Sequence, residues 1–261
     1  MNELIQAIIL GIVQGITEFI PVSSSAHLII AEYYMDSGFT SLAYDVILHL
    51  GTLLSLLVYF RNEILRFIKS LLRGGRDSKL LVLLVVATIP AVLAGYFFQD
   101  VVETALRSLW VIVVMLVLVA ILMFVADRRS GVRKVKDLTT KDALIIGIAQ
   151  VLALIPGTSR AGSTIVAGSL LGMNNAESAR FSFYMAIPVL SGANVRVLGD
   201  SAVRADMAND FVYFAVGFVI AFVIAYFVIR FLLSYLSTHK LAVFAWYRIV
   251  LAAVLTVILV V

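Results

Sequence analysis

Two long apolar stretches of the sequence contain polar side chains that are costly in an apolar environment and that could act on phosphate. An ionisable residue inside a membrane segment costs roughly 2.5–3.5 kcal/mol, which makes it a functional candidate. The ionisable candidates in the first stretch, 3–33, are Glu18 and His27, which are joined by the polar residues Gln14, Thr17, Ser23, Ser24 and Ser25. In the second stretch, 142–172, the candidate is Arg160, which is joined by Thr158 and Ser159. Together they supply a carboxylate, an imidazole, hydroxyls and a guanidinium.

Spacing in the first stretch predicts a small polar site at a bend. Gln14 and Glu18 are four residues apart, so they share one helix face, and Ser24 and His27 are three apart. Pro21 lies between the two pairs and should separate two short helices. Ser23 or Ser24 can cap the second of these helices, whose free N–H groups favour an anion.

The second stretch predicts another anion site, at Gly157-Thr158-Ser159-Arg160 after Pro156. A guanidinium stays charged in proteins, so Arg160 needs an anionic partner in an apolar segment. That partner is a phosphate group of a ligand or, alternatively, Glu18 in a purely structural ion pair. Both interpretations remain open from the residues alone.

Three other ionisable residues are not expected to be catalytic. A single histidine in an apolar helix is usually a satisfied core residue, and this interpretation is given to His49. Asp45 and Glu177 lie near the ends of predicted spans, where solvent reaches them, and are not expected to be catalytic.

Composition places the elements that hold these residues in a membrane. Of 261 residues, 62% are hydrophobic and 14% charged, and the mean hydropathy is +1.06. Soluble domains have about 45–50% apolar and about 25% charged residues. In lipid, backbone groups must bond within each segment, which predicts helices. The absence of cysteine excludes disulfides and thiolate sites. The N-terminus lacks the basic region and cleavage site of a signal peptide.

The predicted fold is an all-α integral membrane protein with six transmembrane helices and two re-entrant helical hairpins. The predicted spans are 44–60, 80–98, 109–126, 181–198, 211–233 and 242–261. The stretches 3–33 and 142–172 are interrupted by proline, and each predicts two short helices that meet at membrane depth. Such a bend is tolerated where protein covers it or where it lines a wet cavity.

Lysine and arginine predict the orientation. The loops 61–79, 127–142 and 234–241 carry 13 of these residues, whereas 32–43, 99–107 and 199–210 carry two. The first group is therefore expected in the cytoplasm, which places both termini outside. The first hairpin then enters from outside and the second from the cytoplasm. Because the positive charge is confined to short loops, it reports orientation and not a nucleic-acid partner.

The two halves of the chain resemble each other. Residues 11–14 (GIVQ) lead to 20–26 (IPVSSSA), and residues 147–150 (GIAQ) lead to 155–161 (IPGTSRA). Each match is followed by three predicted spans, so the second copy should insert upside down. We therefore expect one membrane domain, 1–261, made of a first repeat, 1–126, and a second, inverted repeat, 142–261. The alternative is chance recurrence of Gly, Ile and Pro in apolar sequence.

The same motifs carry a family resemblance. Residues 11–28 (GIVQGITEFIPVSSSAHL) and 155–162 (IPGTSRAG) closely resemble the signatures of the undecaprenyl-pyrophosphate phosphatases, the bacitracin-resistance family. Residues 49–60, 87–95, 179–189 and 247–251 also look like this family, so the resemblance spreads over nearly the whole chain.

The resemblance implies site residues and a cofactor. The family's acidic pair maps onto Gln14 and Glu18, its serine and histidine onto Ser24 and His27, and its arginine onto Arg160. A divalent cation, Mg²⁺ or Ca²⁺, is implied, with Glu18 and Gln14 as ligands. Glutamine in place of an acid leaves Glu18 as the one carboxylate of the site, which puts a strong two-carboxylate metal site in doubt.

The resemblance also implies the reaction. Members of the family hydrolyse undecaprenyl pyrophosphate to the monophosphate carrier used for cell-wall polymers, which confers bacitracin resistance. They act at the outer, periplasmic side of the bacterial cytoplasmic membrane. The expected partners are this polyprenyl pyrophosphate lipid and the bilayer, with no nucleic acid, and a homodimer is left open.

The expected mechanism holds the pyrophosphate between Arg160 and the two helix ends. The expected substrate-binding residues are Gln14, Ser23, Ser25, Gly157, Thr158, Ser159 and Arg160. Ser24 is the favoured nucleophile with His27 as its base, since helical spacing allows their contact. Attack by His27 itself or by water stays open. The rival function is a transporter or flippase for the monophosphate lipid, because inverted repeats with broken helices are transporter architecture. An ion channel fits poorly, because this mixed-sign site would hold an ion.

Overall fold

The computed structural model describes residues 3–35, 42–73, 78–98, 106 and 108–260, and it is helical as predicted. Arg76 and Arg107, which entered the charge comparison, and Val261, at the end of the predicted sixth span, lie outside the described residues. The predicted loop segments 36–41 and 99–105 lie outside them too.

The helices of the first half include one in a segment predicted to be a loop. They are α1 (Glu3–Thr17), α2 (Ser24–Met35), α3 (Leu42–Tyr59), α4 (Arg61–Arg73), α5 (Ser78–Phe97) and α7 (Leu109–Arg129). The unexpected helix is α4, in the predicted loop 61–79. It forms because its residues alternate with helical period between a buried side, which includes Phe67 and Ser70, and exposed positions.

The second half of the chain is helical as well. Its elements are η1 (Val135–Asp137), α8 (Thr140–Val151), η2 (Leu152–Leu154), α9 (Arg160–Leu170), α10 (Asn175–Leu198), α11 (Ser201–Asn209), α12 (Phe211–Leu236) and α13 (Ala242–Val260). The predicted loop 199–210 is largely the short helix α11, which is capped by the Asp200 side chain on the Ala202 N–H at 2.8 Å.

Five helices are long and apolar enough to cross a membrane: α5, α7, α10, α12 and α13. The predicted span 44–60 corresponds to α3, which passes the same test only together with α4, and these two helices are bent by 73°. The described part of the chain therefore has five or six candidate spans. The multi-pass helical class is confirmed.

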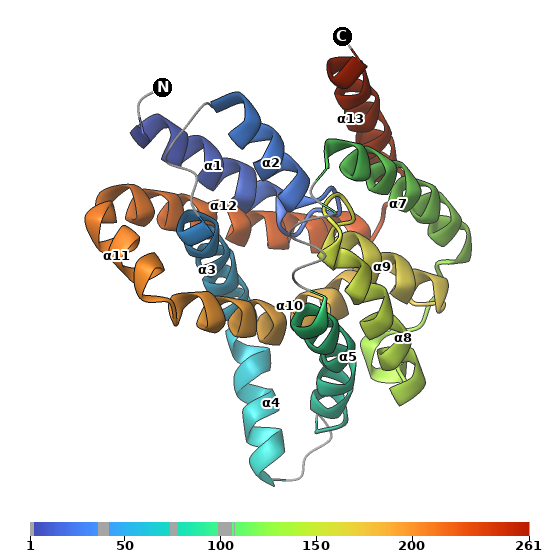
Figure 1. The fold of residues 1–261 in the computed structure, drawn as a ribbon. Helices are drawn as coiled ribbons and strands as arrows, with labels where there is room; N and C mark the ends of the chain where they lie inside the picture. Colours follow the sequence, from blue (N-terminus) through green and yellow to red (C-terminus); the bar gives the residue numbers. More distant parts are fainter. Residues whose placement is uncertain (1–2, 36–41, 74–77, 99–105, 107, 261) are drawn as a thin grey trace.

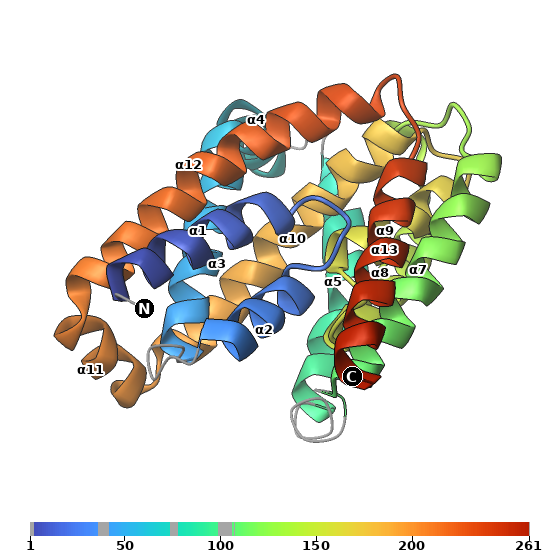
Figure 2. The same cartoon turned by 90° about the horizontal axis from the view of Figure 1, so that it is seen from above.

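The two broken stretches are held by neighbouring spans. Helix α1 packs along α12 and also touches α3, while α8 packs along α5. In Figure 1 the bend after α1 and the bend before α9 lie near the middle of the molecule. Figure 1 shows the start of α1 and the end of α13 on the side of the molecule opposite α4, and Figure 2 shows α1 lying alongside α12.

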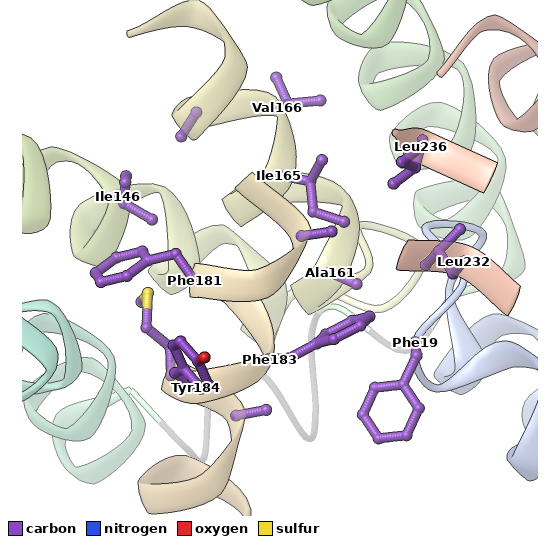
Figure 3. Close-up of a cluster of buried hydrophobic side chains, with 14 of the residues drawn as sticks. Phe19, Ile146, Ala161, Ile165, Val166, Phe181, Phe183, Tyr184, Leu232 and Leu236 are labelled. Carbon is purple, nitrogen blue, oxygen red and sulfur yellow. The ribbon is translucent and has the colours of Figure 1, made fainter. Parts of the chain in front are cut away.

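The largest apolar core lies directly beside both bends (Figure 3). Phe19, next to Glu18, packs edge-to-face on Phe183 of α10 with ring centroids 5.2 Å apart. Ala161, next to Arg160, is fully buried in the same cluster. Burial of these neighbours fixes the direction in which the polar residues project, because the chain cannot turn them without exposing apolar surface.

Candidate functional site

The two bends have the same local construction. Ser23 and Ser159 each precede a helix with a positive φ, 78° and 73°. The Ser23 hydroxyl accepts the Ala26 N–H at 3.4 Å, and the Ser159 hydroxyl accepts the Gly162 N–H at 3.0 Å. Each serine therefore caps the helix that follows it. Of the two caps considered for the first bend, Ser23 is the one formed.

Gly157 seats the second bend against α7. Its φ of 91° lies in the left-handed region, which glycine adopts without steric cost. A Cβ added there would lie 2.8 Å from the Cα of Ile112. No side chain fits at this approach, so the bend and α7 are in direct backbone contact.

Glu18 is the centre of the site. It is 6% exposed, and its Oε1 accepts a hydrogen bond from Arg160 Nη2 at 2.7 Å. Its Oε2 accepts from Gln14 Nε2 at 3.0 Å and from Ser24 Oγ at 2.9 Å. Four of the predicted residues, from both halves of the chain, are thus brought together. The Glu18–Arg160 ion pair considered as the structural alternative is formed.

Arg160 has capacity beyond this pair. Its guanidinium carbon lies 5.8 Å from the ring centre of Phe19, and its Nη1 donates to the Ser182 carbonyl at 3.5 Å. The guanidinium carries five N–H donors in a planar fork. The N–H groups that these contacts do not use can donate to phosphate oxygens while the Glu18 contact is kept.

His49 also belongs to this site, so its interpretation as a core residue is wrong. Its Nε2 lies 3.6 Å from Glu18 Oε2, and its Nδ1 donates to the Asp45 carbonyl at 2.7 Å. The side chain is 31% exposed. No spacing in the sequence links it to Glu18, because α3 and the first bend meet only through tertiary packing.

No hydrogen bond joins His27 to Ser24 in the described structure, contrary to the expectation from their spacing. Its Nδ1 donates to the Ser23 carbonyl at 2.7 Å, and its Nε2 lies 2.7 Å from Tyr247 Oη. The His27 and Tyr247 rings are also stacked, 5.7 Å apart. Ser24 is the first residue of α2, and its hydroxyl turns back toward Glu18. In this arrangement the carboxylate, and not the imidazole, can take the Ser24 proton.

Arg248 of α13 is the main residue that sequence reasoning missed. It is fully buried and donates to the carbonyls of Pro21 at 3.2 Å and Gly157 at 2.7 Å. It also donates to two carbonyls of α7, Met115 and Leu116. Among the described residues no carboxylate lies within 4.0 Å of it. An arginine inside a predicted span was a readable signal, by the same cost argument that identified Arg160.

The other predicted binding residues take different positions. Ser25 is exposed, with its Oγ 3.2 Å from Ser23 Oγ, and it makes no hydrogen bond to Glu18 in the described structure. The Gly157 carbonyl and the Ser159 hydroxyl serve Arg248 and the helix cap. Thr158 Oγ1 is buried without a partner among the described residues. Buried polar atoms normally have one, so it is open to a ligand.

The residues offer little to hold a metal by themselves. The described part of the chain has no group of three His, Cys, Asp or Glu placed to bind one. Both Glu18 oxygens accept hydrogen bonds, whereas Gln14 Oε1 is buried with no described partner. One amide oxygen and one carboxylate fit a cation that takes most of its ligands from water and substrate phosphates, as Mg²⁺ commonly does.

Known proteins are similar to this chain over nearly its whole length. A family model described as bacitracin resistance protein BacA matches residues 7–254. A relative from Rubrobacter xylanophilus, named undecaprenyl-diphosphatase, is 43% identical over 99% of this chain and 99% of its own length. Relatives of the same name from Desulforudis audaxviator and Gemmatimonas aurantiaca are 41% and 43% identical. They cover 97% and 95% of this chain and the same shares of their own.

Proposed function

We propose, since the chain belongs to the bacitracin resistance protein BacA family, that it hydrolyses undecaprenyl diphosphate to undecaprenyl phosphate and inorganic phosphate. This reaction recycles the lipid carrier of cell-wall synthesis. The resemblance drawn from the sequence motifs is confirmed. The observation that carries the chemistry is the Ser24 hydroxyl, 2.9 Å from the buried Glu18 carboxylate that Arg160 holds from the other side.

In the first step Ser24 Oγ attacks the terminal phosphorus. The new Oγ–P bond forms as the bond from phosphorus to the bridging oxygen breaks, and undecaprenyl phosphate leaves. Glu18 takes the hydroxyl proton and passes it to the departing phosphate. Arg160 neutralises the oxygens of the transferred group, which is the main demand of phosphoryl transfer. The free N–H groups at the starts of α2 and α9 favour the same negative charge.

In the second step water attacks the phosphoserine. Glu18 takes a proton from the water and returns it to Ser24 Oγ as the phosphate departs, which restores both residues. His27 acts as a positioning group in this scheme, because both of its ring nitrogens are engaged by Ser23 and Tyr247. Attack by His27 would first require those contacts to break.

We also propose that a divalent cation binds together with the substrate. Bound chiefly through pyrophosphate oxygens, it would neutralise charge on the leaving group. Gln14 Oε1 and Glu18 are the residues that would hold it. Chelation of the cation should lower phosphate release, whereas it should leave the thermal unfolding of the protein unchanged, because protein side chains hold Glu18 through hydrogen bonds.

We propose that each broken stretch is a re-entrant hairpin and that the two repeats are inverted. Three observations support this arrangement. Both bends end in a serine cap with positive φ. Helix α1 packs on α12 of the second half, and α8 packs on α5 of the first. The matched residues Gly11 and Gly147 lie at these two contacts, where an added Cβ would meet backbone atoms of Gly217 and Ala87.

We place the basic loops in the cytoplasm and the site toward the periplasm, with both termini outside. The chain has no cysteine, so single cysteines report topology cleanly. Ala202→Cys in α11 should react with a membrane-impermeant maleimide in intact cells, whereas Lys136→Cys should react only after lysis. Both positions are exposed. The opposite pattern would invert the topology.

Phosphate release by purified protein in detergent tests the enzyme directly, because movement between leaflets cannot occur there. Ser24→Ala should lower release by about a thousandfold or more, as expected for loss of a nucleophile. The matched control is Ser237→Ala, an exposed serine at the end of α12 whose hydroxyl bonds only its own helix turn.

Trapping with substrate labelled on the terminal phosphate tests the nucleophile. Rapid quench should leave label on the wild-type protein and none on Ser24→Ala. Turnover without any protein-bound label would favour direct attack by water. Absence of phosphate release from the wild-type protein, with lipid exchange in vesicles intact, would favour the transporter instead.

A further inference from the structure

A second charged region lies away from Glu18, on the side of the basic loops. A cavity of about 380 Å³ lies between the starts of α4, α5 and α10 and residues 134–136. Its basic lining residues are Arg66, Lys79, Lys134, Lys136 and Arg180. Its acidic ones are Glu63 and Glu177. Five basic side chains against two acidic ones give the cavity a positive field.

The two carboxylates are already compensated. Arg180 lies 3.6 Å from Glu63 and 3.7 Å from Glu177, and Glu177 Oε2 also accepts the Val135 N–H at 2.9 Å. Among the described residues, no carboxylate comes within 4.0 Å of the ammonium groups of the three cavity lysines, in contrast to Arg180. The lysines therefore remain for an anion from outside the chain.

An apolar groove of about 750 Å³ adjoins this cavity. The two share Phe67 and Tyr184 as walls. Side chains of α4, α5 and α10, such as Ile68, Val85 and Ile187, line the groove. The cavity is charged, and the groove that continues from it is apolar. Together they match one molecule with an anionic head and a hydrocarbon tail.

The character of helix α4 indicates that the cavity and the groove lie at the membrane surface. It bends 73° away from α3. Its Leu65, Ile68 and Leu72 are at least half exposed, while Arg66 and Lys69 lie at other positions around the helix. Amphipathic helices with basic polar faces lie in the interface between headgroups and acyl chains. Figure 1 shows α4 on the side opposite the start of α1 and the end of α13.

We propose that the cavity and the groove together bind an anionic phospholipid. Its phosphate lies among Lys79, Lys134 and Lys136, and an acyl chain lies in the groove along α5. Free phosphate would use the lysines and leave the groove empty, while a neutral lipid would fill the groove and leave the lysines unmatched. The positive loops mark the cytoplasmic leaflet, whose anionic phospholipids are attracted to such clusters.

The head of this site is tested by native mass spectrometry of the full chain in detergent with added phosphatidylglycerol. The variant Lys79→Gln/Lys134→Gln/Lys136→Gln should weaken binding by about tenfold or more, since each basic residue near the surface contributes. The control Arg128→Gln/Arg129→Gln/Lys141→Gln removes the same charge from exposed positions outside the cavity and should bind normally. Equal weakening in both variants, or equal binding of phosphatidylcholine by the wild type, would overturn the proposal.

The tail of the site is tested by filling the groove. Val85→Trp should weaken phosphatidylglycerol binding, whereas Val114→Trp, on an equally exposed position of α7 outside the groove, should not. Thermal unfolding checks that each variant is folded. Displacement of phosphatidylglycerol by inorganic phosphate alone would reduce the site to an anion pocket and overturn the lipid assignment. Tighter binding of undecaprenyl phosphate than of phosphatidylglycerol would assign the site to the reaction product instead.

Discussion

The two bends have the same backbone conformation but carry different functional groups. Each follows a proline, turns through a serine with positive φ, and starts a helix whose third N–H bonds that serine. The first bend supplies the carboxylate and the hydroxyl, and the second supplies the guanidinium. In the proposed mechanism the two bends therefore have different roles although their backbones are alike: the first carries the nucleophile and its base, and the second carries the arginine that neutralises the phosphate.

The structure also changes how the two bends correspond. Alignment of the IPVSSSA and IPGTSRA motifs pairs Ser24 with Ser159. The caps instead pair Ser23 with Ser159, which puts Ser24 opposite Arg160 as the first residue of each helix. The hydroxyl and the guanidinium thus occupy equivalent positions. Each lies at the N-terminus of its helix and bonds the same carboxylate, that of Glu18.

Removing the clamp of the second bend should have the largest effect. Arg160→Ala should lower kcat/KM for phosphate release by about a thousandfold or more, as loss of a phosphate-binding arginine does elsewhere. Arg160→Lys should recover only part of the lost kcat/KM. An ammonium lacks the planar fork with which a guanidinium can bond Glu18 and phosphate at once. Arg230→Ala, at an exposed position of α12, is the control. Near-normal turnover of Arg160→Ala would remove the basis for the assigned site.

Replacing Arg248, which bonds carbonyls of both bends, should lower kcat/KM by an intermediate amount. Arg248→Lys keeps the charge but cannot serve four carbonyls at once. A shift of the bends by about 1 Å should cost up to about a hundredfold in kcat/KM. Steady-state kinetics with thermal unfolding separates two cases. A lower melting temperature with unchanged kcat and KM would show that Arg248 stabilises the fold without positioning the site.

Removing the helix caps, the hydroxyls of Ser23 and Ser159, should have the smallest effect. These variants test the similarity of the two bends most directly. Ser23→Ala and Ser159→Ala should each cost about 1 kcal/mol of unfolding free energy. Ser159→Ala should cost more, since its hydrogen bond is shorter, 3.0 Å against 3.4 Å. The glycine variants should be milder, because glycine tolerates the positive φ. Denaturant unfolding measures this series, and glycine variants less stable than the alanine ones would contradict the capping argument.

Much of the fold could be predicted because lipid restricts the choices. The broken helices follow from Pro21 and Pro156, and the long spans follow from apolar runs. Helix α4 was not predicted, because the charge of residues 61–79 indicates a loop and only their helical period indicates a helix. Arg248 was not predicted either, although an arginine in a span carries the same cost as Arg160 and is therefore a signal in the sequence.

The sequence by itself determined the helical membrane class, the family, the two bends and four residues that meet at the site: Gln14, Glu18, Ser24 and Arg160. These follow from composition, proline positions and the expense of polar groups in an apolar segment. Only the tertiary structure decided that Ser24 bonds Glu18 and not His27, and that His49 joins them. The reason is physical: helical spacing fixes which residues share a face, but packing between helices distant in sequence fixes which faces meet.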